Sequence, residues 1–186
     1  TTDFVVSNST IITHAENESK SLFGQINSFV TDKVELIGGA RYSEDTQYYN
    51  RIALPGAPLP AGTDRIGAPA SSDEITGKLG ANLHVTDDLM YYATISKGYK
   101  AGGVNLTLGT PDFKPEKNLV YELGMKSTML DRRLRINGNL FYSDYTDIQF
   151  SSLFNALPLT QNAASGESVG PELEPTGRFG GRGLNS

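Results

Sequence analysis

Apolar and polar residues alternate along much of this chain with a period of two. Between residues 75 and 85, Ile75, Leu79 and Leu83 stand at odd positions, and polar residues such as Asn82 stand at even ones. A helix would distribute these residues around its circumference, whereas a strand sorts them onto two faces. The pattern therefore predicts strands with one apolar face and one polar face.

The alternation recurs in five further stretches, and no stretch has a convincing helical period. The expected strands span residues 21–30, 34–44, 75–85, 91–100, 119–129 and 134–143. Tight polar turns, in which Asp bonds readily to the nearby backbone, join them in pairs at residues 31–33, 86–88 and 130–133. Long irregular connections are expected between the pairs, at residues 53–72, 101–115 and 151–165. The short turns therefore lie at one end of the hairpins and the long loops at the other.

This organisation is typical of a transmembrane β-barrel. The longest apolar run is Leu89 to Ala93, whereas a transmembrane helix needs about 20 mostly apolar residues. Outer-membrane barrels combine alternating strands with short periplasmic turns and long outer loops. A soluble β-sandwich also alternates, but its turn signals recur every ~8–12 residues, whereas the stretches 33–50 and 133–150 are longer. The barrel is the favoured fold, and the sandwich is the alternative.

Composition and motifs argue against several other classes of protein. The net charge of −5 and the absence of Cys disfavour a general nucleic-acid binder and rule out thiolate chemistry. His14 and His84 are far apart in the sequence and lack a carboxylate cluster, so no metal site is expected. Residues 166–170 match the Gly-x-Ser-x-Gly nucleophile motif, but both histidines precede Ser168, against the order of that triad. We therefore expect no catalytic residue and no cofactor.

The acidic pairs of the sequence are interpreted as solvated ends of strands and turns. They stand at residues 44–45, 73–74 and 87–88. A calcium site in the outer loops is the alternative for these carboxylates.

Three longer segments share a recognisable pattern. Residues 91–105 read YYATISKGYKAGGVN, residues 115–126 read PEKNLVYELGMK, and residues 141–149 read FYSDYTDIQ. In this order they resemble the barrel of TonB-dependent outer-membrane receptors, and the resemblance extends over residues 20–174.

The resemblance implies an all-β protein, an antiparallel transmembrane β-barrel in the outer membrane of a Gram-negative bacterium. Family barrels have about 22 strands, so residues 1–186 are expected to be a partial barrel domain of about six to eight strands. The family's N-terminal plug domain is not recognisable here. The implied function is active uptake of a large, scarce solute, most often a ferric siderophore, by a protein that is not an enzyme.

The resemblance also implies the partners of the receptor. These are outer-membrane lipid, a siderophore-like ligand, and a TonB-type energy-transducing partner that acts through the plug; nucleic acid is not among them. A passive porin-like or structural barrel stays open as an alternative function, as does a soluble β-sandwich adhesin.

The candidate ligand-binding residues are inward polar residues near the outer ends of the strands. They are Arg41, Tyr92, Lys97, Tyr99 and Lys100. Arg and Lys make strong hydrogen bonds to anions, and siderophore complexes are often anionic. For each residue the alternative is a structural role in shaping the end of its strand.

Overall fold

All secondary-structure elements in the described part of the chain are strands. The computed structural model describes residues 11–53, 65–66, 69–105, 110–154 and 157–177. The strands are β1 (Ile11–Phe29), β2 (Val34–Ala53), β3 (Arg65–Ile66), β4 (Ala70–Thr86), β5 (Leu89–Lys100), β6 (Glu116–Met129), β7 (Leu134–Thr146), β8 (Gln149–Phe154), β9 (Leu157–Asn162) and β10 (Gly166–Gly177). No helix in the described ranges is long and apolar enough to cross a membrane.

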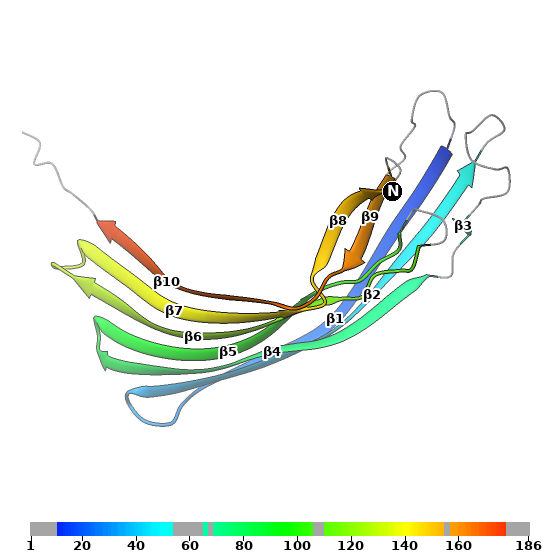
Figure 1. Ribbon diagram of the computed structural model, residues 1–186. Helices are drawn as coiled ribbons and strands as arrows, with labels where there is room; N and C mark the ends of the chain where they lie inside the picture. Colours follow the sequence, from blue (N-terminus) through cyan, green and yellow to red (C-terminus); the bar gives the residue numbers. More distant parts are fainter. Residues whose placement is uncertain (1–10, 54–64, 67–68, 106–109, 155–156, 178–186) are drawn as a thin grey trace, which may run out of the picture.

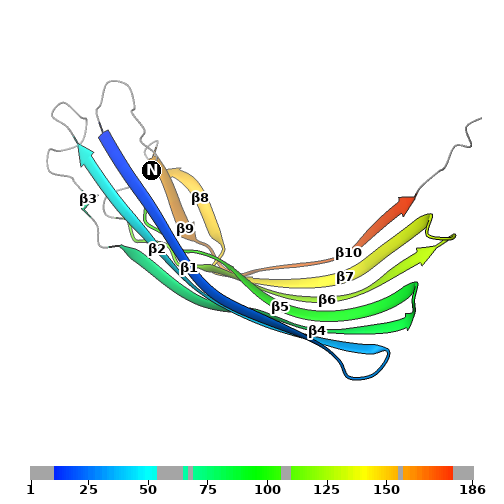
Figure 2. The ribbon, with the colours of Figure 1, turned by 180° about the vertical axis from the view of Figure 1, so that it is seen from behind.

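Eight strands form one antiparallel sheet in the order β1-β2-β4-β5-β6-β7-β10, with the short β3 paired to β2, and β8 and β9 form a separate two-stranded sheet. Figure 1 shows the larger sheet as a single curved layer, and Figure 2 shows it from behind. The hairpins β1–β2, β4–β5 and β6–β7 turn tightly at one end of the layer. The expected fold class, a partial antiparallel barrel, is confirmed.

The register places apolar side chains in rows across the sheet. Leu79, Ile95, Tyr121, Tyr142 and Val169 are direct cross-strand neighbours on five successive strands. Shifting one strand by a single residue would move its apolar side chains to the other face, so this row fixes the register. The face is also exposed, with Leu79 at 64% and Val169 at 78% relative accessibility. An exposed apolar surface of this extent suits contact with lipid.

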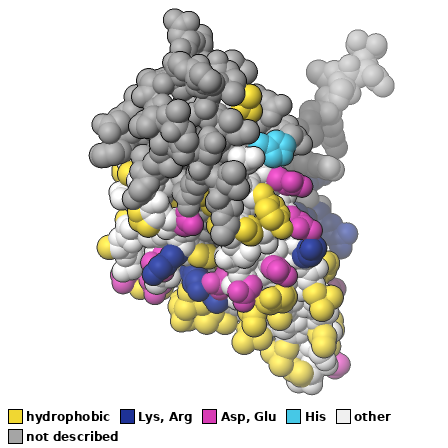
Figure 3. Space-filling model, turned by 90° about the vertical axis from the view of Figure 1, so that its right-hand side faces the viewer, with side chains coloured by type: hydrophobic (Ala, Val, Ile, Leu, Met, Phe, Trp, Pro, Cys, Tyr) yellow, Lys and Arg dark blue, Asp and Glu magenta, His cyan; other side chains and the backbone are white. Residues whose placement is uncertain are grey.

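The sheet has almost no hydrophobic core of its own. Among the described residues, the buried hydrophobic side chains are Val104, in the loop after β5, and Leu159, in β9. In Figure 3 hydrophobic side chains gather along the lower part of the view, and charged side chains form a band above them. The described sheet therefore has an apolar face and a polar face but almost no buried hydrophobic core.

Three details differ from the sequence-based expectation. The first strand is longer than predicted, because β1 begins at Ile11, and β2 extends to Ala53, beyond the long stretch expected at 33–50. The connection predicted at residues 151–165 is wrong, since it contains most of the hairpin β8–β9. Asp147, at a φ of 54°, turns the chain out of β7 just before that hairpin. The connection predicted at 53–72 lies mostly outside the described residues, and β4 already begins at Ala70.

The final strand also resolves an ambiguity in the sequence. Pro171 lacks the N–H that a central strand needs, which disfavours a strand around it. In the structure β10 includes Pro171 and pairs with β7 alone.

Candidate ligand-binding site

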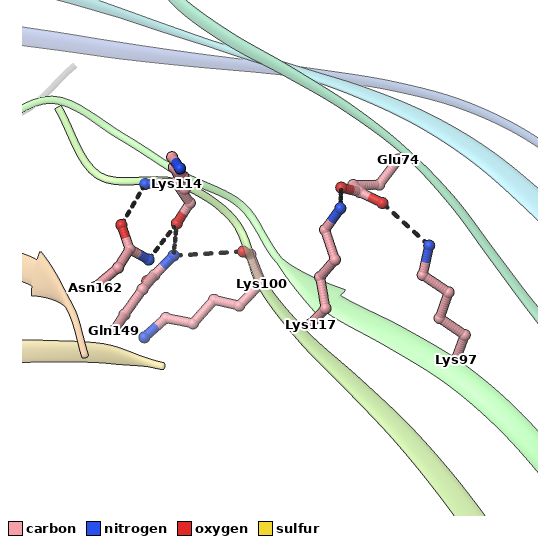
Figure 4. A network of polar contacts seen from close by, with 7 residues as sticks. All are labelled: Glu74, Lys97, Lys100, Lys114, Lys117, Gln149 and Asn162. Carbon is pink, nitrogen blue, oxygen red and sulfur yellow. Dashed lines mark hydrogen bonds and ion pairs between the residues drawn. The ribbon is translucent and has the colours of Figure 1, made fainter. Parts of the chain in front are cut away.

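Charged side chains meet on the polar face near the outer ends of β4, β5 and β6. Lys97 Nζ lies 3.3 Å from Glu74 Oε2, and Lys117 Nζ contacts Glu74 Oε1. The Glu74 side chain is 9% exposed, whereas those of Lys97 and Lys117 are 41% and 39% exposed. Figure 4 shows the carboxylate between the two ammonium groups. We refer to these three residues as the Glu74 cluster.

The cluster depends on where the ladder between β4 and β5 ends. The last rung joins Gly77 to Lys97, and β4 beyond this point pairs only with β2. Lys97 stands two residues after Ile95, so alternation places it on the apolar face. Its ammonium group nevertheless contacts the Glu74 carboxylate. The loss of pairing beyond this rung leaves room for β5 and β6 side chains to reach the Glu74 carboxylate.

Two further polar contacts flank the Glu74 cluster. Arg41 Nε donates a hydrogen bond to Ser43 Oγ at 2.9 Å. The Tyr99 hydroxyl donates to Asp45 Oδ2. A hollow of about 300 Å³ adjoins these groups. Its polar and aromatic lining comprises Phe23, Gln25, Arg41, Thr76, Lys78 and Lys97. Three of these six side chains are cationic, so the hollow suits an anionic group.

The structure brings together three of the five predicted ligand-binding residues. Arg41, Lys97 and Tyr99 lie in or beside this cationic region. The backbone carbonyl of Lys100 accepts a long hydrogen bond from Gln149. Figure 4 shows that the Lys100 side chain is directed away from Glu74. The candidate ligand-binding site therefore centres on Arg41, Lys97 and Tyr99.

Tyr92 lies in a separate polar group, and the prediction that it stands near the outer end of its strand is wrong, because β5 begins at the short turn before Leu89. The Tyr92 hydroxyl donates to Glu122, and Lys126 Nζ lies 5.4 Å from its ring centroid. A Cβ atom at Gly124, its direct neighbour on β6, would come within 2.5 Å of the tyrosine ring. Tyr92 is thus packed across a glycine, which favours the structural role over ligand binding.

Sequence reasoning missed Glu74 and Lys117. The prediction that the pair 73–74 is a solvated strand end is wrong for Glu74, which is buried between the lysines. A signal was present, because alternation with the apolar Ile75 assigns Glu74 to the polar face. Nothing in the local sequence shows that Lys117, on another strand, is its partner.

A second group of side chains fixes the loops beside the site. Four amide side chains form hydrogen bonds mainly to backbone groups of other segments. We call these residues the amide clamp: Gln47, Asn105, Gln149 and Asn162. Gln47 Oε1 accepts from the Val104 N–H at 2.8 Å. Gln149 Nε2 donates to the carbonyl oxygens of Ala101 and Lys114 at 2.8 and 3.1 Å. Side chains from β2, β8 and β9 and from the loop after β5 thus hold one another in place.

Asn105 is the most buried member of the amide clamp, at 3% exposure. Its Nδ2 donates to the carbonyl oxygens of Pro111 and Thr160 at 2.8 and 2.6 Å. Its Oδ1 accepts from the Thr160 N–H at 2.7 Å. Asn162 makes the matching contacts with Lys114, accepting from its N–H at 2.7 Å and donating to its carbonyl at 3.0 Å. These paired bonds attach the hairpin β8–β9 to the loop between β5 and β6.

Two other motifs noted in the sequence can be placed in the described structure. Ser168 lies within β10, paired with Ser143 of β7, and not on the strand-to-helix turn that a nucleophile elbow requires. No group of three or more potential metal ligands occurs among the described residues. The chemistry that the site offers is hydrogen bonding and charge, suited to binding a solute.

The fold agrees with the outer-membrane receptor barrel that the sequence resemblance implies. The family model "TonB dependent receptor-like, beta-barrel" matches residues 2–185. The chain therefore belongs to this family, which places it in the outer membrane of a Gram-negative bacterium.

Known relatives agree with this assignment. The pesticin receptor of Yersinia enterocolitica is 30% identical over 169 residues, which are 87% of this chain and 24% of that protein. The crystal structure of the ferric yersiniabactin uptake receptor FyuA from Yersinia pestis matches 92% of this chain and 26% of its own, with 25% identity and a TM-score of 0.72. The siderophore receptor PiuA from Acinetobacter baumannii shares the fold, with 20% identity, a TM-score of 0.71, and 89% of this chain and 24% of its own covered. The chain spans about a quarter of the length of these relatives.

Proposed function

We propose that this chain is part of the wall of an outer-membrane receptor that takes up a ferric siderophore. The observation that carries the proposal is the group of cations at the outer end of the polar face. Lys97, Lys117 and Arg41 present N–H donors there, where a solute entering from outside would meet them. Long loops of outer-membrane barrels lie on that side.

The class of cargo follows from the donors and from the relatives. The oxygen atoms that bind iron in a siderophore carry negative charge, and charge-assisted hydrogen bonds from Lys and Arg are about twice as strong as neutral ones. The FyuA receptor takes up ferric yersiniabactin, and this chelate is the natural first probe. Tyr99, held beside the cations through Asp45, adds an aromatic surface for the organic part of the chelate.

The proposed receptor works by energy-dependent release of its cargo. The barrel wall and loops select the chelate, and a TonB-type partner supplies the energy that moves it inward. The amide clamp supports this role because it fixes the loop after β5 and the hairpin β8–β9 beside the cations.

The test is uptake by the complete gene product that contains this chain. It is produced in a Gram-negative strain lacking its own siderophore synthesis and receptors, and the strain is given radiolabelled ferric yersiniabactin. We expect iron to accumulate, and the accumulation to disappear when the energy-transducing partner is deleted. Accumulation that survives the deletion would favour the passive porin-like barrel. Absence of both binding and accumulation would contradict the proposal.

A further inference from the structure

Glu74 is placed so that a ligand meets its lysines and not the carboxylate itself. The Glu74 side chain is 9% exposed, while Lys97 and Lys117 are 41% and 39% exposed. Each carboxylate oxygen accepts from a different lysine, Oε2 from Lys97 and Oε1 from Lys117. The carboxylate is therefore far less accessible to a ligand than the two ammonium groups that contact it.

The pair of lysines exists because of the carboxylate. Lys97 comes from β5 and Lys117 from β6, and among the described residues Glu74 is the one ion-pair partner of each. The two oxygens of a carboxylate share one carbon atom, so both ammonium groups are drawn to nearly the same place. Two like charges so close repel each other. Without Glu74 these long, half-exposed side chains would separate.

We propose that Glu74 is a positioning residue that presents Lys97 and Lys117 as a preformed pair of donors to two anionic oxygens of one chelate. This inference rests on the proposed uptake of a ferric siderophore. Each ammonium group has three N–H donors, and the contact with Glu74 leaves others for the ligand. Fixing a lysine side chain costs conformational entropy, and a pair that is already held in place avoids much of that cost on binding.

A positioning role and simple electrostatics predict opposite changes in the affinity for an anionic chelate when Glu74 is neutralised. Glu74→Gln makes the site more positive, which by charge alone would strengthen the binding of an anion. The same change removes the group that holds the lysines together, which weakens binding if Glu74 positions them. The direction of the change in affinity therefore distinguishes a positioning role from mere neutralisation.

The experiment measures binding and uptake of ferric yersiniabactin by the complete gene product. For Glu74→Gln we expect KM and Kd to rise about tenfold, with the maximal uptake rate unchanged, because only preorganisation is lost. The matched control is Asp73→Asn, which removes the same charge from the exposed neighbouring residue and should leave KM unchanged. In a Lys97→Met, Lys117→Met background, Glu74→Gln should have no further effect, because it acts through those lysines.

The remaining outcomes test the positioning role of Glu74 and the proposed uptake function separately. If Glu74→Gln binds the chelate as tightly as the unaltered protein or more tightly, the positioning role is wrong while the uptake function stands. If Glu74→Gln does not assemble in the membrane, the single lysine variants carry the test. Lys97→Met and Lys117→Met should each raise KM as much as the double variant does, and additive effects would overturn the pairing. If the unaltered protein neither binds nor takes up the chelate, the proposed function fails and this inference fails with it.

Discussion

The amide clamp and the Glu74 cluster lie beside each other at the outer end of the sheet but use different chemistry (Figure 4). The clamp bonds neutral amides to backbone groups, and its Asn105 is 3% exposed. The Glu74 cluster joins charged side chains, and its two lysines are about 40% exposed. Both connect segments far apart in the sequence.

The difference assigns the two regions different tasks. A buried, neutral hydrogen bond is costly to leave unmade and is little affected by salt. An ion pair with exposed lysine ends contributes little stability and is screened by salt. The clamp therefore suits holding loops in one arrangement. The cluster suits a binding site, where donors must be available to an incoming ligand.

The largest expected effect is the loss of the amide clamp on Asn105→Ala. The substitution leaves the Pro111 and Thr160 carbonyls and the Thr160 N–H without their partner. Each buried unsatisfied group costs about 1–3 kcal/mol, so we expect the hairpin β8–β9 to detach while the large sheet persists. Hydrogen exchange at the Thr160 amide should then be at least about a hundredfold faster, where 1.4 kcal/mol corresponds to tenfold.

The matched control for this prediction is Gln161→Ala. Gln161 is an exposed neighbour on the same strand, so its removal should leave the Thr160 amide protected. Equal exchange in Asn105→Ala and in the unaltered protein would show that the hairpin is held by something other than the clamp.

A somewhat smaller effect is expected from Gly102→Ala in the loop after β5. A Cβ atom there would lie 2.5 Å from the Phe113 carbonyl oxygen and 3.1 Å from the carbonyl carbon of Lys114. Because these neighbours are backbone atoms, the loop must shift, at a cost of about 1–3 kcal/mol. Limited proteolysis of residues 101–115 should become faster. Gly98→Ala is the control, since a Cβ at Gly98 has nothing within 4 Å, and equal sensitivity of the two variants would contradict the close packing.

Salt should separate the two regions without any substitution. Raising ionic strength from about 0.1 to 1 M shortens the screening length from about 10 to 3 Å. We expect acylation of Lys97 and Lys117 by an amine-reactive reagent to become about two- to threefold faster, because their contacts with Glu74 weaken. Exchange at the Thr160 amide should not change over the same range. A parallel response of both regions would mean that the clamp also depends on charge.

The smallest effect on stability is expected for Lys117→Met. The lysine end of the Lys117–Glu74 ion pair is 39% exposed, and Lys97 still contacts the buried Glu74 carboxylate, so the cost should stay at about 0–1 kcal/mol, as for an exposed pair. Urea unfolding in lipid vesicles should therefore give a free energy within about 1 kcal/mol of the unaltered value. A loss several times larger would indicate that the Glu74 cluster is a structural element, which would weaken its assignment to binding.

Most of the sheet could be predicted from the sequence. Alternation located the strands β4 to β7 and the turns between paired strands, because side chains in a strand repeat every second residue. It failed for β8 and β9, where Ser151 faces Thr160 and Ser152 faces Leu159, so that no clear apolar face distinguishes the segment. It also underestimated β1, whose outer half continues with polar residues on both faces.

The site was predictable only in part. Arg41, Lys97 and Tyr99 were singled out because they are cationic or aromatic residues near the ends of the expected strands, although β2 in the structure continues past Arg41 to Ala53. Their partners were not, because Glu74 is 23 residues from Lys97, and Tyr99 is 54 residues from Asp45.

The sequence by itself determined the two-faced strands and the position of the short turns, because each depends on residues that are neighbours along the chain. Only the tertiary structure decided that Glu74 contacts two lysines and that Asn105 meets Thr160, 55 residues away. These contacts join segments that only the assembled sheet brings together. These contacts depend on where the β4–β5 ladder ends and on how the loop after β5 packs against β9. Neither feature can be predicted from residues that are close in the sequence.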